Sequence, residues 1–285
     1  MKHTLLTNLK NETILSDIVL NLRLKVKEVI FVDKKTWSAV GKMLIWVIPF
    51  ALVGGYFTGI YTLEHSTDEL AGQIVEQLGS PAAFYLLTMV QSTVYAVIAT
   101  ILGYFLANRV GLIRPLGFQR DILKKTLPII VLLGVLFAAD YFVSGALIPE
   151  VAADYEKGIS PAYFIASLTY GGIVEEILMR WFLMSLIGWA LVMIFARKKE
   201  KADLPEWILI VANILAALIF AAGHLPATMA FFGGITPVIL LRCFLLNGGF
   251  AMVFGRFYRK YGIQYAVLAH FGVHLISKLI LIFFI

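Results

Sequence analysis

Residues 169–183 read Thr-Tyr-Gly-Gly-Ile-Val-Glu-Glu-Ile-Leu-Met-Arg-Trp-Phe-Leu, an apolar stretch that carries Glu175, Glu176 and Arg180. An ionisable group at the centre of a bilayer costs about 2.5 to 3.5 kcal/mol on insertion scales, so such groups face the protein interior, pair with one another or mark a functional pathway. A chain in hydrocarbon must also satisfy its own backbone hydrogen bonds, which a helix does. The stretch therefore predicts a membrane-spanning helix with a charged inner side.

The composition of the whole chain agrees with a membrane protein. The 285 residues are 60% hydrophobic and 15% charged, whereas soluble globular domains are about 45 to 50% apolar and 25% charged. The net charge of +6 is typical of a polytopic protein whose Lys and Arg residues gather in cytoplasmic loops, so we expect the lipid bilayer and not nucleic acid as a partner. The single cysteine, Cys243, excludes an intrachain disulfide and a multi-cysteine zinc cluster.

Seven apolar runs are long enough to cross the bilayer, which takes about 20 helical residues. The alternation of about ten residues that marks a membrane barrel is missing. The sequence thus predicts an all-α, polytopic transmembrane helical bundle over residues 38–285. The expected spans are Ser38–Leu63, Pro81–Asn108, Thr126–Pro149, Pro161–Ala196, Trp207–Leu225, Pro237–Tyr258 and Ile263–Ile285.

The charges of the connecting loops predict the orientation. Lys and Arg gather before the first span and in 109–125, 197–201 and 256–260, while the loops at 64–76 and 150–156 are acidic. Because Lys and Arg stay on the cytoplasmic side, we expect an integral protein of a bacterial plasma membrane with a cytoplasmic N-terminus.

The N-terminal segment, residues 1–37, is therefore expected in the cytoplasm. Within it, Ile14–Val32 alternates apolar and charged residues. This pattern is that of an amphipathic segment on the inner leaflet, with a solvated helix or a loosely ordered tail as the alternative.

The fourth span is too long for one straight crossing. As a continuous helix, Pro161–Ala196 would measure about 54 Å at 1.5 Å per residue, against about 30 Å of hydrocarbon. We expect Gly171 and Gly172 to kink or interrupt it, or the chain to bend along the inner surface after Trp181. Tyr170 and Trp181, which flank the charged motif, are expected to be packing residues.

The spacing of the charged residues separates the two glutamates. Glu176 and Arg180 are four residues apart, so they meet on one face of a helix as an ion pair. Glu175 is turned about 100° away and lacks that partner, which leaves it free to act as a general base toward water. The alternative is that both glutamates only brace helices.

Three histidines lie in the later apolar runs. His224 shares a helix face with Phe220, and Pro226 is expected to end or kink that helix. His270 and His274 also share a face, from which they can bind a metal ion or orient each other. The loop charges place His270 toward the cytoplasmic side and His224 toward the outer side.

These residues together resemble a known family. The ordered motifs Glu175-Glu176-x-x-x-Arg180, Phe220-x-x-x-His224 and His270-x-x-x-His274 are similar to those of the CAAX-prenyl endopeptidase and bacteriocin-processing intramembrane proteases, also called the CPBP or Abi family. The resemblance covers residues 175–274.

The resemblance implies a role for each motif residue. Glu175 would be the base, Glu176 and Arg180 the bracing pair, His224 the partner that orients water, and His270 an oxyanion donor. His274 stands where the family usually has asparagine, although an imidazole can also donate a hydrogen bond. Read as a zinc site, the ligands would be Glu175, His224, His270 and His274.

The expected function is therefore an intramembrane endopeptidase that hydrolyses a peptide bond of a membrane-associated peptide or protein, without a cofactor. A zinc-dependent mechanism is the alternative chemistry. The alternative functions are a noncatalytic membrane scaffold or bacteriocin-immunity protein, and a proton-coupled transporter, although the chain shows no repeated half.

Two other sets of charged residues lie within the apolar runs. We expect Asp140 and Arg242 to pair with each other or to line the same cavity. We expect Lys278 to extend its amine toward the headgroups.

Overall fold

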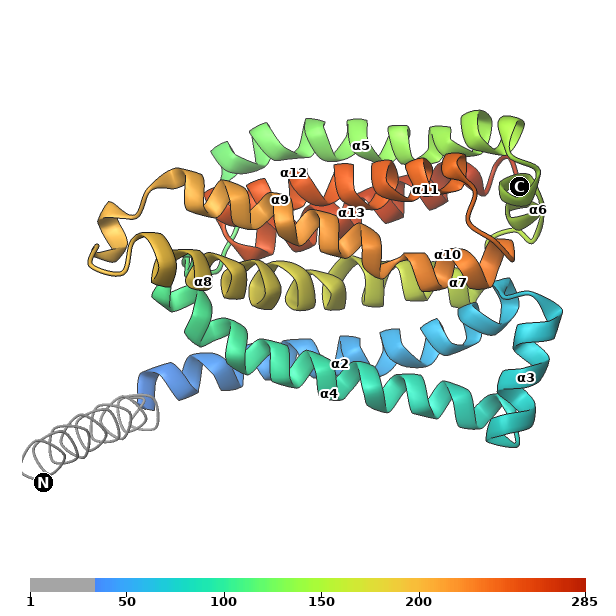
Figure 1. Cartoon of the computed structure of the whole chain (residues 1–285), viewed down its shortest axis with the longest axis horizontal. Coiled ribbons are helices and arrows are strands. Elements are labelled where there is room, and N and C mark those ends of the chain that lie inside the picture. The colour runs from blue at the N-terminus through green and yellow to red at the C-terminus, as the bar shows by residue number, and fades with distance from the viewer. Residues whose placement is uncertain (1–33) are drawn as a thin grey trace, which may run out of the picture. The chain divides into compact units, whose positions relative to one another are not determined.

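A computed structural model describes residues 34–285, and residues 1–33, which include the predicted amphipathic segment, lie outside the described part. The chain divides into two compact units, 1–43 and 44–285, and the second holds every residue of the predicted site. In the described part every regular element is a helix and none is a strand (Figure 1). The all-α prediction is confirmed.

Within residues 34–285, seven helical segments are long and apolar enough to span a membrane, which confirms the expected number. They are α2 (Lys34–His65), α4 (Pro81–Arg109), α5 (Arg120–Leu147), a fourth span over Pro161–Phe195, a fifth over Glu206–Phe232, a sixth over Pro237–Tyr261, and α13 (Ile263–Leu281). Short helices α3 (Asp68–Leu78), α6 (Pro149–Glu156) and η3 (Lys201–Asp203) lie in the loops between them.

Three of the spans begin with the same local signal. Ser80, Ser160 and Thr236 are N-caps whose hydroxyl oxygens accept a hydrogen bond from the backbone N–H three residues on. Each is followed by proline as the first helical residue, where a missing N–H removes no helical hydrogen bond. All three spans begin at the same end of the bundle.

The fourth span does not break at Gly171 and Gly172. It runs through α7 (Pro161–Ala166), the π-helices η1 (Ser167–Val174) and η2 (Ile177–Met184), and α8 (Ser185–Phe195). Glu175 and Glu176 thus sit between two π-helical stretches, a rare conformation that occurs frequently at functional sites.

The fifth span extends further than predicted. α9 (Glu206–Gly223) ends at His224, and a second helix, α10 (Leu225–Phe232), begins directly after it. The predicted end at Leu225 was wrong because Pro226 lies in the first turn of α10, a position that tolerates proline. The sixth span is built from α11 (Pro237–Cys243), the π-helix η4 (Phe244–Gly249) and α12 (Phe250–Tyr261).

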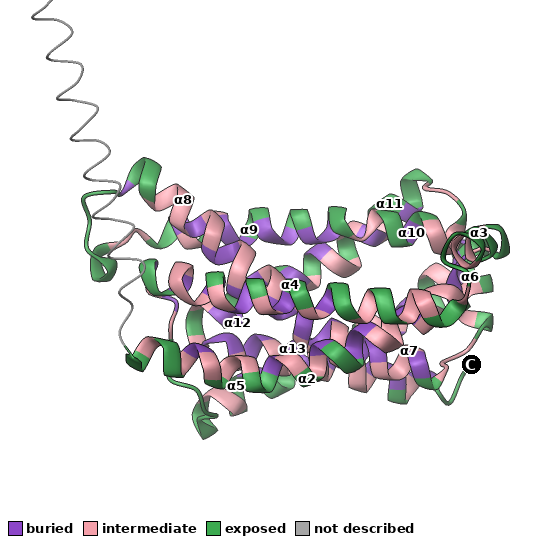
Figure 2. Ribbon diagram, turned by 90° about the horizontal axis from the view of Figure 1, so that it is seen from below, coloured by how far each residue is buried: buried purple, intermediate pink, exposed green. Residues whose placement is uncertain are grey.

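The last helix, α13, is the centre of the packing. It contacts α5, η1 and α12, and the buried residues line the inner sides of the helices while exposed residues face outward (Figure 2). Gly172 lets η1 approach α13 closely, because an added Cβ there would lie 2.7 Å from Cα of Phe271. Many exposed side chains are large and apolar, as on Leu87, Leu132 and Leu218, which suits a surface in contact with lipid.

We predict that Gly172→Ala destabilises the bundle by about 1 to 3 kcal/mol, since overpacking forces the backbone of α13 to move. The measurement is the midpoint of thermal unfolding in detergent. Gly249→Ala is the matched control, because a Cβ at Gly249 meets nothing within 4 Å. Equal midpoints for the two variants would contradict the role assigned to Gly172.

Candidate active site

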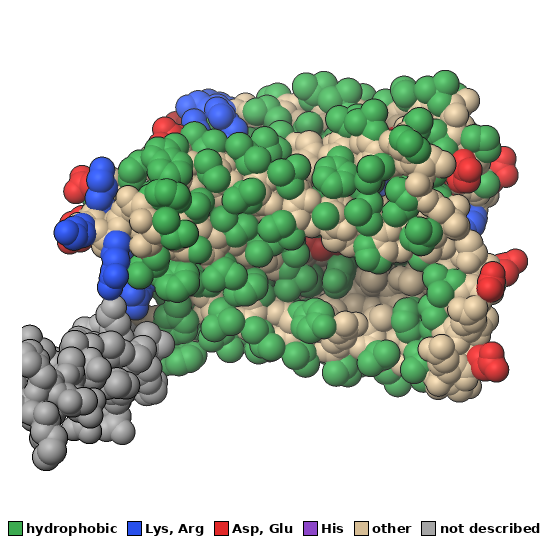
Figure 3. Space-filling model, in the orientation of Figure 1, with side chains coloured by type: hydrophobic (Ala, Val, Ile, Leu, Met, Phe, Trp, Pro, Cys, Tyr) green, Lys and Arg blue, Asp and Glu red, His purple; other side chains and the backbone are tan. Residues whose placement is uncertain are grey.

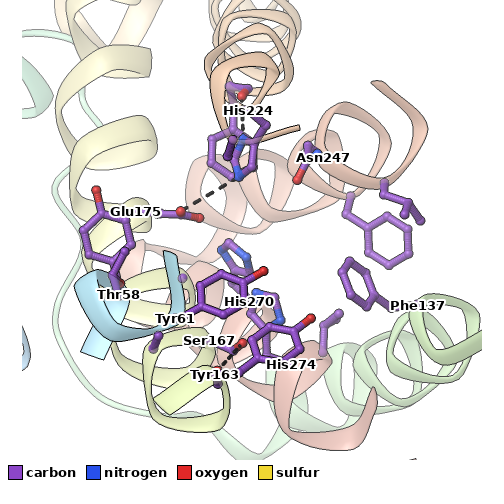
Figure 4. Close-up of a pocket in the computed structure, with 18 of the residues that line it drawn as sticks. Thr58, Tyr61, Phe137, Tyr163, Ser167, Glu175, His224, Asn247, His270 and His274 are labelled. Atoms are coloured by element: carbon purple, nitrogen blue, oxygen red, sulfur yellow. Dashed lines mark hydrogen bonds and ion pairs between the residues drawn. The ribbon is translucent and has the colours of Figure 1, made fainter. Parts of the chain in front are cut away.

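A cavity of about 400 Å³ lies inside the bundle and collects the predicted site residues. Glu175, His224, His270 and His274 all line it. Figure 4 shows Glu175 and His224 facing each other, with the rings of His270 and His274 beside them. Side chains from the fourth, fifth and seventh spans therefore meet in one cavity.

Glu175 and His224 form the most accessible part of this group. Oε1 of Glu175 lies 3.9 Å from Nε2 of His224, and their side chains are 17% and 30% exposed. This separation is too long for a direct hydrogen bond, yet two acceptors so placed can both accept from one water molecule at about 2.8 Å from each. The pair is therefore arranged to orient a water.

The break between α9 and α10 fixes the ring of His224. Its Nδ1 lies 2.8 Å from the carbonyl oxygen of Phe220, one turn earlier. A carbonyl only accepts, so Nδ1 carries the proton and Nε2 of the neutral ring presents a lone pair toward Glu175. The resulting tautomer is the one that can accept a hydrogen bond from water.

Glu176 lies behind the cavity and is fully buried. Its Oε1 is 2.9 Å from Nη1 of Arg180 and 2.8 Å from Nδ1 of His270. The guanidinium of Arg180 lies over the rings of Phe220 and Phe254, at 4.8 and 5.5 Å from their centroids. The adjacent glutamates thus have different surroundings: Glu176 is paired within the protein, while Glu175 faces the cavity.

The contact with Glu176 limits what His270 can do. A carboxylate accepts, so Nδ1 of His270 donates to it, and Nε2 becomes a donor only when the ring is an imidazolium. His274 stacks on His270 at 4.9 Å between ring centroids, and its Nδ1 has no hydrogen-bond partner among the described residues. His274 is therefore able to take either tautomer.

The same residues fit a zinc site poorly in this arrangement. Within residues 34–285, no three side chains of His, Cys, Asp or Glu are grouped closely enough to hold a metal ion. As placed, the four residues do not form a zinc-binding set.

The loop charges predicted that His224 and His270 lie toward opposite sides of the membrane, yet both line the same cavity. Because the fifth span continues to Phe232, His224 lies eight residues inside the span instead of at its end. His270 lies seven residues inside α13. Both residues are therefore near the middle of their spans.

Several cavity residues were not found from the sequence. Thr58, Tyr61, Tyr163 and Asn247 line the cavity, and Tyr61 stacks on Tyr163 at 4.5 Å. Their signal was weak, because a lone hydroxyl or amide in an apolar helix is common in membrane proteins.

Tyr170, which was expected to be a packing residue, lines the cavity. Trp181 is buried as expected, and its Nε1 donates to the carbonyl oxygen of Thr100. The sequence alone did not indicate which of these two aromatic residues lines the cavity and which is buried.

Of the predictions for the other charged residues in the spans, one is confirmed and one is wrong. Arg242 pairs with both carboxylate oxygens of Asp140, which confirms the predicted pair. Lys278 does not reach toward headgroups, and that prediction was wrong. Its side chain is buried, and Nζ donates to the hydroxyl of Tyr163 at 2.8 Å, because Tyr163 supplies a nearer partner inside the bundle.

Comparison with known proteins agrees with the motifs. Residues 157–276 match the family described as type II CAAX prenyl endopeptidase Rce1-like. This match supports membership of the CAAX-prenyl endopeptidase and bacteriocin-processing family, as the motif resemblance predicted. No curated protein and no solved structure matches the chain.

We predict that Arg180→Met destabilises the protein by about 3 to 5 kcal/mol, because it leaves the carboxylate of Glu176 buried without an opposite charge. The double variant Glu176→Gln/Arg180→Met should regain much of the lost stability. Chemical unfolding in detergent measures both.

The matched control for this prediction is Lys124→Met. Lys124 pairs with Asp121, and their side chains are 63% and 88% exposed, so its loss should cost at most about 1 kcal/mol. A loss for Arg180→Met no larger than that of the control would contradict the buried network.

Proposed function

We propose that this protein is an intramembrane endopeptidase that hydrolyses a peptide bond of a membrane-associated peptide or protein. The observation that carries the proposal is the pair Glu175 and His224, placed 3.9 Å apart on the wall of an internal cavity. The family match over residues 157–276 supports the same reaction class.

The first step uses the unpaired carboxylate. A water molecule donates one hydrogen bond to Glu175 and one to Nε2 of His224, which turns an oxygen lone pair toward the substrate. Glu175 accepts a proton as the water oxygen attacks the carbonyl carbon of the scissile bond. The new C–O bond converts that carbon into a tetrahedral centre with an oxyanion.

The oxyanion needs hydrogen-bond donors placed where the negative charge develops. His274 can donate as a neutral ring, and His270 can donate from Nε2 as an imidazolium whose charge Glu176 balances. Collapse of the intermediate breaks the C–N bond, and Glu175 passes its proton to the leaving nitrogen. The products are a carboxylic acid and an amine, which ionise to a carboxylate and an ammonium group in water, so atoms and protons balance without a cofactor.

The surroundings of the cavity suit a substrate held in the membrane. Figure 3 shows the apolar face hollowed between α4 and the row formed by α9 and α10. Residues of α2 and α10, including Tyr61 and Ala227, line the cavity below this face. A peptide anchored in lipid can therefore approach the cavity without leaving the bilayer.

We predict that Glu175→Gln slows cleavage by about 100-fold to 10,000-fold, since it removes the general base but keeps the side-chain shape. The measurement compares membrane peptides from cells that express the wild type and the variant, and it also identifies the substrate. Asp121→Asn is the control, because this carboxylate in the first turn of α5 is 88% exposed and does not line the cavity.

His224→Ala should cause a similar loss, and combining both substitutions should cost less than the product of the single losses, because the two groups act on one water. Full turnover by Glu175→Gln would remove the catalytic assignment. If no cleavage product appears only in cells that express the wild-type protein, the noncatalytic scaffold or immunity role is favoured.

We predict that cleavage persists after exhaustive chelation and that added Zn²⁺ does not raise it. The reason is that the proposed chemistry uses only carboxylate and imidazole groups. The measurement is the initial rate before chelation, after it, and after metal is added back. A rate that falls with chelation and returns with Zn²⁺ would establish the zinc alternative.

A further inference from the structure

The two ends of the bundle carry opposite charges. Figure 3 shows Lys and Arg gathered at one end together with a few acidic residues, and Asp and Glu with almost no Lys or Arg at the other. In the loops of the acidic end, Lys157 is the single Lys or Arg among the described residues. The acidic end holds Glu64, Asp68, Glu69, Glu76, Glu150, Asp154 and Glu156, and the basic end holds Arg109, Arg114, Arg120, Lys124, Lys125, Arg197, Lys198, Lys199, Lys201, Arg256, Arg259 and Lys260.

This asymmetry orients the bundle. Short loops rich in Lys and Arg stay in the cytoplasm, and acidic residues contribute little to the choice. The acidic residues at the basic end therefore do not weaken the assignment; they are Asp121, Glu200, Asp203 and Glu206. Arg242 lies inside a span, where Asp140 neutralises it. The acidic end is consequently the noncytoplasmic one.

The cavity lies in the half of the bundle next to the acidic end. Tyr61 is four residues before the end of α2 at that side, and Tyr163 is two residues after the start of the fourth span. Phe231 is one residue before the end of the fifth span. Three spans thus place their acidic-end residues on the cavity wall.

A second, smaller cavity extends the first one toward the acidic loops. Its volume is about 150 Å³, and it shares Tyr61, Tyr163 and His224 with the larger cavity. Its other walls include His65 at the end of α2 and Asp154 of α6, which bond to each other at 2.8 Å. The pair of cavities therefore leads from Glu175 and His224 toward the acidic end.

The opposite direction is filled by packed side chains. Tyr258 is fully buried and hydrogen-bonds to Ser185 at 2.9 Å. Met184 and Tyr265 are also buried, and Trp181 is held by its bond to Thr100. These residues lie between the cavity and the basic loops, so the packed layer separates Glu175 from the cytoplasmic end.

We infer that the active-site cavity is entered from the noncytoplasmic side, and that its substrate is a membrane-anchored peptide whose cleaved segment lies on that side. The inference rests on the proposed peptidase function for the nature of the substrate. The direction of access rests only on the cavities, the packed layer and the loop charges.

The test is cysteine labelling of the full chain in spheroplasts with a charged, membrane-impermeant maleimide. The native Cys243 is buried and can remain in place. Glu150→Cys reports the acidic end, Lys199→Cys the basic end, and Ala227→Cys the cavity wall. Leu218→Cys, on the lipid-facing side of α9 and 47% exposed, is the control for a position without water.

We expect Glu150→Cys and Ala227→Cys to label to the same extent before and after permeabilisation, Lys199→Cys to label only after it, and Leu218→Cys to stay unlabelled. Thr62→Cys, another cavity position, replaces Ala227→Cys if that variant does not fold.

Labelling of the cavity position only after permeabilisation, or not at all, would overturn the inference. A reversed pattern at Glu150 and Lys199 would also overturn it. Because labelling requires no turnover, these results are independent of whether Glu175→Gln abolishes cleavage.

Discussion

A carboxylate buried inside a membrane protein must be compensated within the protein, and Glu176 shows how this chain does so. One oxygen of Glu176 forms an ion pair with Arg180 and accepts a hydrogen bond from Nδ1 of His270, and the bond to His270 joins the fourth span to the seventh. Removing one of these partners would leave an uncompensated charge in the apolar interior. The network therefore fixes the ring of His270 at the cavity wall and sets the relative placement of the two spans.

The same constraint leaves the neighbouring glutamate available. Consecutive residues of a helix point in different directions, so Glu175 cannot share the partners of Glu176. It faces the cavity instead, where His224 is held by the carbonyl group of Phe220. Adjacent positions of one helix thus supply a buried ion pair and a carboxylate that faces the cavity.

The bundle also separates lipid from water along its length. Its outer surface is apolar and its charged loops lie at the two ends (Figure 3). The second cavity extends the site toward the acidic loops. The packed layer around Tyr258 and Trp181 keeps the other end closed. The proposed hydrolysis needs water, which under the inference above enters from one side while the spans remain in contact with lipid.

The sequence by itself determined the seven spans, the loop charges and the pairing of Glu176 with Arg180, because hydropathy and the spacing of four residues along a helix are local properties. It also predicted which histidines belong with Glu175, through the motif resemblance. Only the tertiary structure decided that His270 bonds to Glu176, that Tyr61 and Tyr163 line the cavity, and that Lys278 is buried. These contacts join residues far apart in the chain, and their partners are chosen by how helices pack, which no local pattern specifies.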